Sequence, residues 1–250
     1  MLNIFGRAVS AVFAVVVAVL VSTLYGESIT GKLLTVLITA GVVALFEVLK
    51  IWLPRHSARG RQLLDPRSQF TGVWLQEGVK QYGSDGVNIE APNRFAIFVV
   101  GYQKETDNYE VDGAAYTAEG DEHARWESTD VANFAKDGRA MSYEFTGTIT
   151  NADLGPEDPR RTGFCRVKLL DGDSGRGRVD HVAVNAVLLF NLSRVTTKWL
   201  VAHNLLQFKL DNLKDPVQRN RLAKALVASG GIPILKDAAG PRRRSQTAGL

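Results

Sequence analysis

Two long runs of uncharged, mostly apolar residues at the start of the chain limit what it can fold into. Residues 8–26 hold no charged side chain, and residues 33–53 hold only Glu47 and Lys50, close to the end of the run. An α-helix needs about 20 apolar residues to cross the hydrocarbon core of a bilayer. A short polar segment with two glycines, residues 25–32, separates the two runs. We therefore expect residues 1–53 to form two antiparallel transmembrane helices joined by a tight turn.

A cleaved signal peptide is the alternative interpretation of the first run. A second apolar run follows at once, and no clear small-residue cleavage site is present, so the pattern favours two true spans. Cytoplasmic flanks of membrane helices are enriched in Lys and Arg. The arginines that follow the second run are Arg55, Arg59, Arg61 and Arg67. We expect both termini to be cytoplasmic, and the single cysteine, Cys165, agrees with a reducing compartment.

Small residues recur every four positions in both expected spans, a spacing that lets helix backbones approach closely in lipid. They are Gly6, Ser10, Ala14, Ala18 and Ser22 in the first span, and Ala40 and Ala44 in the second. They either pack the two helices against each other or form a face for self-association between protomers. Glu47 is either a functional carboxylate within the membrane or, as the pattern favours, a residue near the cytoplasmic interface that extends its carboxylate to water or pairs with Lys50 three residues later.

The rest of the chain is rich in short strand-like runs. Residues 54–69 are basic and polar and are expected to form a linker. The expected strands lie at 70–76, 94–103, 109–117, 124–130, 141–150, 163–170, 178–184 and 186–193. Several alternate in polarity: Tyr143, Phe145 and Ile149 share one face of their strand. About eight short strands separated by turns predict an all-β domain over 70–195, a lipocalin-like antiparallel barrel with room for one ligand.

The C-terminal segment, residues 196–250, changes to a helical pattern. Asp215 is a good N-cap with Pro216 at the first helical position, and Gly230-Gly231 is a stop signal. The expected apolar stripe of this helix is Val217, Leu222, Leu226 and Val227. Residues 197–213 are ambiguous between strand and helix, and residues after about 237 are expected to be disordered.

Composition excludes several kinds of functional site. One cysteine in 250 residues rules out an intrachain disulfide framework and a multi-cysteine zinc site. The four histidines show no ligand spacing on one helix, and no nucleophile elbow, P-loop or zinc-protease motif is present. We therefore expect no catalytic site, no metal and no cofactor. The formal charge of +4 is mild and is compatible with an anionic ligand.

The expected barrel carries cations and aromatic residues that could bind a small nucleotide. Aromatic rings stack on bases, and Arg binds phosphate oxygens through two hydrogen bonds. The candidate ligand-binding residues are Arg125, Trp126, Tyr143, Arg166, Lys168 and Arg178. Arg166 and Lys168 are the leading pair, because they share one face of a strand. Since Phe164 and Leu170 share that face, it is equally a mixed outer surface.

A two-span hairpin, a basic linker and a β-rich domain that begins Phe70-Thr71-Gly72-Val73-Trp74 together resemble one family. They resemble the two-transmembrane-helix β-barrel effectors of cyclic-oligonucleotide-based antiphage signalling systems (CBASS). The Gly-x-Trp motif at 72–74 also resembles the first-strand signature of lipocalin-like barrels. The C-terminal helix and the Arg242-Arg243-Arg244 tail have no counterpart in this pattern.

The resemblance implies a non-enzymatic antiviral defence protein of the bacterial inner membrane. Its barrel would bind a cyclic di- or trinucleotide, the protomers would form a homo-oligomer, and the spans would disrupt the lipid bilayer in an abortive infection. It implies no DNA or RNA partner. Three alternatives remain open: a barrel that binds lipid or another small hydrophobe, a membrane-anchored scaffold with a filled barrel, and a hydrolase whose site converges from separate strands.

Overall fold

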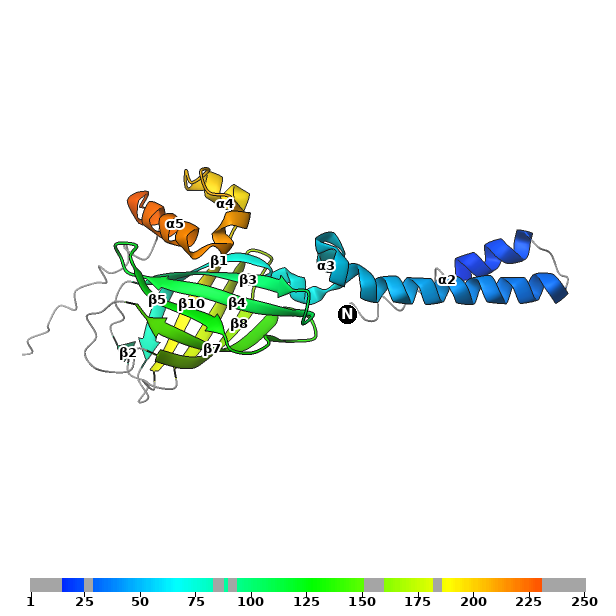
Figure 1. Ribbon diagram of the computed structural model, residues 1–250, viewed down its shortest axis with the longest axis horizontal. Coiled ribbons are helices and arrows are strands. Elements are labelled where there is room, and N and C mark those ends of the chain that lie inside the picture. The colour runs from blue at the N-terminus through cyan, green and yellow to red at the C-terminus, as the bar shows by residue number, and fades with distance from the viewer. Residues whose placement is uncertain are drawn as a thin grey trace, which may run out of the picture. The chain divides into compact units, whose positions relative to one another are not determined.

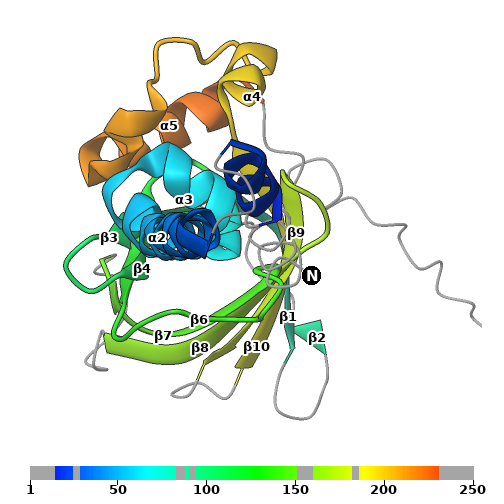
Figure 2. The same cartoon turned by 90° about the vertical axis from the view of Figure 1, so that its right-hand side faces the viewer.

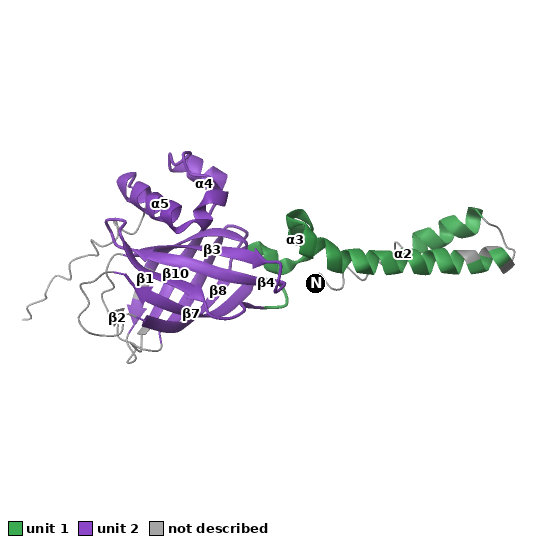
Figure 3. Ribbon diagram, viewed as in Figure 1, with its two compact units in different colours: residues 1–69, 135–138 green, residues 70–134, 139–250 purple. Residues whose placement is uncertain are grey.

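The computed structural model describes residues 15–24, 29–82, 88–89, 94–150, 160–181 and 186–230. The chain divides into two compact units, one made of residues 1–69 and 135–138, the other of 70–134 and 139–250 (Figure 3). The first unit contains the apolar helices and the second contains the strands.

The first unit is built on a long apolar helix, α2 (Ile29–His56), with a second described helix at Val15–Leu24 (Figure 1). Within the described residues, one helix is long and apolar enough to cross a membrane, over Thr35–His56. Its large apolar side chains are exposed, among them Leu33, Val36, Leu37, Leu45, Val48 and Ile51. An apolar helix that no protein core covers is suited to a lipid environment.

The expectation of two spans is thus met only in part. The first expected span, residues 8–26, is described only over Val15–Leu24, which is shorter than the about 20 residues that a span needs. The rest of it lies outside the described residues, together with Gly6, Ser10 and Ala14. Of the other small residues expected to pack helices, Ala18 is half-buried, and Ser22, Ala40 and Ala44 are exposed. The expected pair of Lys50 Nζ and Glu47 Oε1 is present at 2.6 Å.

The segment expected to be a basic linker, residues 54–69, is largely helical. Helix α2 continues through Pro54 to His56, α3 follows over Ala58–Leu64, and the 3₁₀ helix η1 spans Pro66–Phe70. The Ser57 hydroxyl caps α3 by accepting the Gly60 backbone N–H at 3.2 Å. Gly60 lies against α2, where a Cβ would meet the Leu53 carbonyl oxygen at 2.6 Å. The sequence pattern did not predict α3, because the segment is basic and polar, as is typical of a linker.

The second unit is a closed antiparallel β-barrel of eight strands (Figures 1 and 2). The barrel strands are β1 (Gly72–Tyr82), β3 (Phe95–Gln103), β4 (Asn108–Tyr116), β5 (Glu122–Ser128), β7 (Ala140–Ile149), β8 (Arg160–Leu169), β9 (Ser174–His181) and β10 (Ala186–Val195). Each pairs with the next, and β1 pairs with β10 to close the sheet. Two short strands, β2 (Asn88–Ile89) and β6 (Asn133–Phe134), pair with β1 and β7. The expected barrel is confirmed.

One end of the barrel is filled by side chains. Trp74 of the Gly-x-Trp motif is fully buried there, and its indole N–H donates to the Phe70 carbonyl oxygen at 2.7 Å. The Arg194 guanidinium lies over the Trp74 ring, 4.5 Å from its centroid, and donates to the Thr71 carbonyl oxygen at 2.9 Å. Phe70, Phe134 and Tyr109 pack beside this tryptophan in the same core. This end, at which the chain enters β1, is the plugged end.

The C-terminal helices cover the outer face of β1, β3 and β4 (Figure 2). They are α4 (Thr197–Ala202), the 3₁₀ helix η2 (Leu210–Lys214) and α5 (Pro216–Ala228), so the ambiguous segment 197–213 contains helix. The Asp215 carboxylate caps α5 as expected, accepting the Val217 N–H at 3.0 Å. Val217 itself is 56% exposed, which corrects the expected stripe, and Ala223 and Arg219 take buried positions on α5. Residues 231–250 lie outside the described residues.

Candidate ligand-binding cavity

A cavity of about 330 Å³ lies toward the end of the barrel opposite the plugged end. Residues near the ends of β1, β4, β7 and β9 and near the starts of β3, β5, β8 and β10 line it. The volume falls at the lower end of the range of about 300–1,000 Å³ that small-molecule pockets span. The barrel is therefore hollow toward the end opposite the plugged end, and it is filled by side chains at the plugged end.

The walls of the cavity are largely apolar. Ala96, Phe145, Val179 and Leu188 come from four different strands. Trp126 of β5 also lines the cavity, opposite Gly113 of β4 in the strand register. A Cβ at Gly113 would lie 2.5 Å from the Trp126 ring, so glycine at this position makes room for the indole. An apolar wall with an aromatic ring suits a planar group of a ligand.

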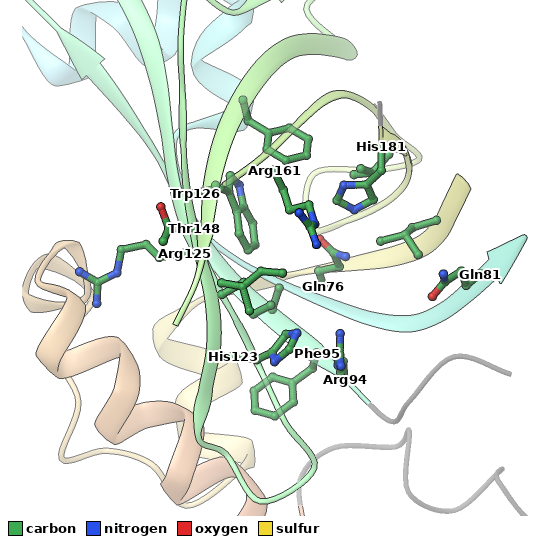
Figure 4. Close-up of a pocket in the computed structure, with 18 of the residues that line it drawn as sticks. Gln76, Gln81, Arg94, Phe95, His123, Arg125, Trp126, Thr148, Arg161 and His181 are labelled. Carbon is green, nitrogen blue, oxygen red and sulfur yellow. The ribbon is translucent and has the colours of Figure 1, made fainter. Parts of the chain in front are cut away.

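Two pairs of basic side chains interrupt the apolar wall (Figure 4). Arg94, before β3, and His123 of β5 lie beside each other, and Arg161 of β8 and His181 of β9 form the second pair. Gln76 lies between them and also faces the cavity. Among the described lining residues there is no Asp or Glu. The described lining residues therefore offer an anion several hydrogen-bond donors and no carboxylate that would repel it.

The environment of both imidazoles favours their neutral form. Burial lowers the pKa of His123, and the nearby Arg94 charge lowers it further. Burial likewise lowers the pKa of His181, with a contribution from Arg161 that Asp180 partly opposes. The buried Nδ1 of His181 has no hydrogen-bond partner among the described residues. An anion placed in the cavity would stabilise the protonated imidazoles that the free protein disfavours.

Deeper in the barrel, Tyr143 and Cys165 face each other from β7 and β8. Burial raises the pKa of the Tyr143 hydroxyl well above its ordinary value, and it raises the pKa of the Cys165 thiol to about 12. A thiol reacts as its thiolate, so Cys165 is suited to packing and unsuited to nucleophilic chemistry.

The structure brings two of the expected binding residues, Trp126 and Tyr143, into the cavity. Arg125 borders the same space but its side chain points away from it (Figure 4). Its guanidinium is held by Glu122 Oε2 at 2.8 Å on the outer surface, where the Asn220 amide of α5 donates to the same oxygen. Neighbouring residues of a strand point to opposite faces, so Arg125 and Trp126 do not share a site.

The other three expected residues, Arg166, Lys168 and Arg178, lie on the outer surface of β8 and β9 and do not line the cavity. On β8 the inward positions are Cys165, Val167 and Leu169, which forces the residues between them outward.

Sequence reasoning missed four cavity residues, Arg94, His123, Arg161 and His181. Two of them carried a usable signal: Arg161 lies four residues before Cys165, and His181 lies two residues after Val179, so each shares a buried face. His123 gave no such signal, because a register irregularity in the pairing of β4 with β5 places it. Arg94 gave none either, because it lies just before β3, outside the alternation of that strand.

Comparisons with known proteins give only distant likenesses. No family model and no curated protein matches the chain. Among solved structures, a redesigned β-barrel matches at 13% identity and a TM-score of 0.35, over 52% of this chain and 96% of that one. The tryptamine complex of the amine-binding protein of Rhodnius prolixus matches at 15% identity and 0.36, over 62% and 87%. Transferrin-binding protein B of Neisseria meningitidis matches at 10% and 0.33, over 50% of this chain and 26% of that chain. Scores this low carry no argument about function.

Proposed function

We propose that the chain is a membrane-anchored binding protein whose barrel holds a small anionic ligand. The observation that carries this proposal is the cavity with two Arg–His pairs and no carboxylate among its described lining residues. Burial lowers the pKa of the Arg94 guanidinium, so the free protein keeps this cation partly dehydrated. A bound anion offsets that cost, because charge pairs interact more strongly in a site that excludes water.

We propose a cyclic di- or trinucleotide as the ligand. Such a molecule combines phosphates, which Arg binds with good geometry, and bases, which stack on aromatic rings. The two basic pairs supply the first requirement and Trp126 the second. Both features belong to one cavity, and this combination supports a nucleotide over an uncharged ligand.

The proposed role is that of an antiphage effector of the CBASS type. In this proposal α2 and the preceding apolar run both span the bacterial inner membrane, with both termini in the cytoplasm. Ligand binding drives assembly of protomers, and the assembled spans disrupt the bilayer. The exposed apolar surface of α2 and its exposed Ala40 and Ala44 support the membrane part. Binding can drive assembly only if the ligand has a higher affinity for the assembled state.

An anionic lipid is the second candidate ligand. The apolar walls contributed by Ala96, Phe145, Val179 and Leu188 would accommodate an acyl chain, while the Arg–His pairs would hold its head group. This candidate shares the anionic group with the first and differs in lacking a base. Mass spectrometry of organic extracts from the purified full chain would reveal a stoichiometric lipid.

Calorimetric titration of the full chain in detergent micelles tests the proposed ligand. The panel consists of cyclic di- and trinucleotides, their linear forms, and the uncharged nucleosides as controls. We expect one cyclic nucleotide to bind with a Kd below about 1 μM and the nucleosides not to bind. If a folded chain that is free of co-purified lipid binds no member of the panel, the nucleotide proposal is wrong.

A further inference from the structure

The outer face of β8 and β9 carries four cations in two directly opposed pairs. In the strand register Arg166 lies opposite Arg178, and Lys168 lies opposite Arg176. All four side chains are exposed. We call these four residues the basic face. It lies outside the cavity, whose lining residues include none of the four.

The arrangement is unfavourable for the barrel alone, because like charges directly opposite on neighbouring strands repel. Local contacts relieve it only in part. Asp180 Oδ1 lies 2.6 Å from the Arg178 guanidinium, and the Arg166 guanidinium lies 5.0 Å from the centroid of the Phe164 ring. Glu144 of β7 is the other carboxylate on the adjoining outward row, opposite Phe164. At these strand positions four cations face two carboxylates. In the adjoining turn Asp171 accepts the Ser174 hydroxyl at 2.7 Å and Asp173 lies 3.4 Å from the Arg194 guanidinium, so cations remain in excess.

The basic face lies toward the plugged end of the barrel. Lys168 precedes the end of β8 by one residue, and Arg176 is the third residue of β9. The chain enters β1 at this same end, after leaving α2, α3 and η1. The C-terminal helices cover β1, β3 and β4 and leave β8 and β9 uncovered within the described part of the barrel unit. The cations are therefore near the point where the barrel is tethered.

We propose that the basic face docks the barrel on anionic lipid head groups of the membrane that holds α2. This inference rests on the proposed membrane anchor, and it does not depend on the ligand in the cavity. A tether keeps the barrel at a high local concentration beside the bilayer, so a weak electrostatic contact is sufficient. Clustered Lys and Arg next to a membrane anchor are attracted by anionic lipids and are screened by salt. Docking would leave the cavity, at the opposite end, accessible to soluble ligands.

Fluorescence quenching in nanodiscs tests this contact with the full chain. The native thiol Cys165 is buried, so a cysteine introduced by Leu170→Cys, beside the basic face, can be labelled selectively. A second preparation carries the label at Arg221→Cys on α5. The discs contain either phosphatidylcholine or a mixture with phosphatidylglycerol, and both contain a lipid with a quencher on its head group. We expect anionic discs to quench the label at 170 about twofold or more above zwitterionic discs, with no change at 221.

Two triple variants give the matched comparison. Arg166→Gln, Lys168→Gln and Arg176→Gln together remove most of the basic face, whereas Lys198→Gln, Lys209→Gln and Lys214→Gln remove the same charge from exposed positions of the C-terminal segment. We expect the first variant to lose the additional quenching and the second to keep it. Equal quenching in both discs, or loss in both variants, overturns the docking face. If the chain incorporates into neither kind of nanodisc, the proposed membrane anchor is wrong as well. If the basic face retards labelled RNA in a gel and shows no lipid-dependent quenching, it binds nucleic acid and not lipid.

Discussion

Arg161 and Arg166 stand five residues apart on one strand, and their surroundings differ completely. Arg161 lines the cavity, whereas Arg166 lies on the outer face. An odd separation on a strand places two side chains on opposite faces. Residue type alone therefore could not select the binding cations. Cys165 points into the barrel. Arg161, four residues before it, points to the same side, whereas Arg166, one residue after it, points outward.

The buried Arg219 of α5 is a second residue whose role the sequence hides. It is fully buried, and its guanidinium donates to Asp112 Oδ2 of β4 at 2.7 Å. An arginine in an amphipathic helix is normally assigned to the solvent face. Its partner lies 107 residues away in sequence, so only the tertiary structure reveals the pair.

For the two cavity histidines, we predict that ligand binding is linked to proton uptake. The pKa values of His123 and His181 are lowered in the free protein, and an anion beside them would raise both. The complex then binds more protons than the free protein, so affinity increases as pH falls from about 7.5 to about 6. Calorimetry in buffers of different ionisation enthalpy measures the protons taken up.

The double variant His123→Gln/His181→Gln is the control for this linkage, and it should bind the ligand with little dependence on pH.

The stability of the free barrel changes with pH in the opposite direction to ligand affinity. A lowered pKa means that the unfolded chain binds more protons below the ordinary value of 6.5, so the free barrel loses stability as pH falls through that range. Affinity that weakens on acidification, while the barrel stays folded, would contradict the assignment of these histidines to an anion site.

Among the elements, strands and the capped helix α5 were predictable because their signals are local. Alternation, turn residues and the Asp-Pro cap are all legible in the sequence, and all eight expected strands overlap the barrel strands. The face that α5 buries was less predictable, because the partner surface is set by the outer side of β3. That strand is buried on both faces over residues 95–100, an arrangement that depends on where the C-terminal helices pack.

The packing of α5 gives a prediction about stability. Leu226 is fully buried against the barrel, whereas Val217 on the same helix is 56% exposed. We expect Leu226→Ala to lower the free energy of unfolding by about 2–5 kcal/mol, because it leaves a cavity. Val217→Ala should change it by less than about 0.5 kcal/mol. Denaturant unfolding of the two variants provides the measurement. Equal losses of unfolding free energy would mean that Val217 is buried, as the sequence predicted, and would contradict the packing described here.

The whole molecule combines a long apolar helix with a barrel that has two different ends. The plugged end holds the Trp74–Arg194 stack, and the other end holds the cavity. The sequence predicted the closed barrel and the apolar segment, since strand number and hydropathy are regional properties. It could not predict that the barrel is hollow at one end only, because that depends on which inward side chains meet across eight strands.

The proposed function requires an anionic ligand to bind inside the barrel and not on its outer cations. Arg161→Gln and Arg166→Gln test it as a pair, since they remove the same charge from the same strand on opposite faces. Titration of the full chain with the tightest cyclic nucleotide of the panel should show Arg161→Gln weakening binding by about tenfold or more, because hydrogen bonds to charged groups contribute about 1.5–3 kcal/mol each. Arg166→Gln should leave the Kd within about twofold of the parent chain. A large loss with Arg166→Gln and none with Arg161→Gln would contradict the account.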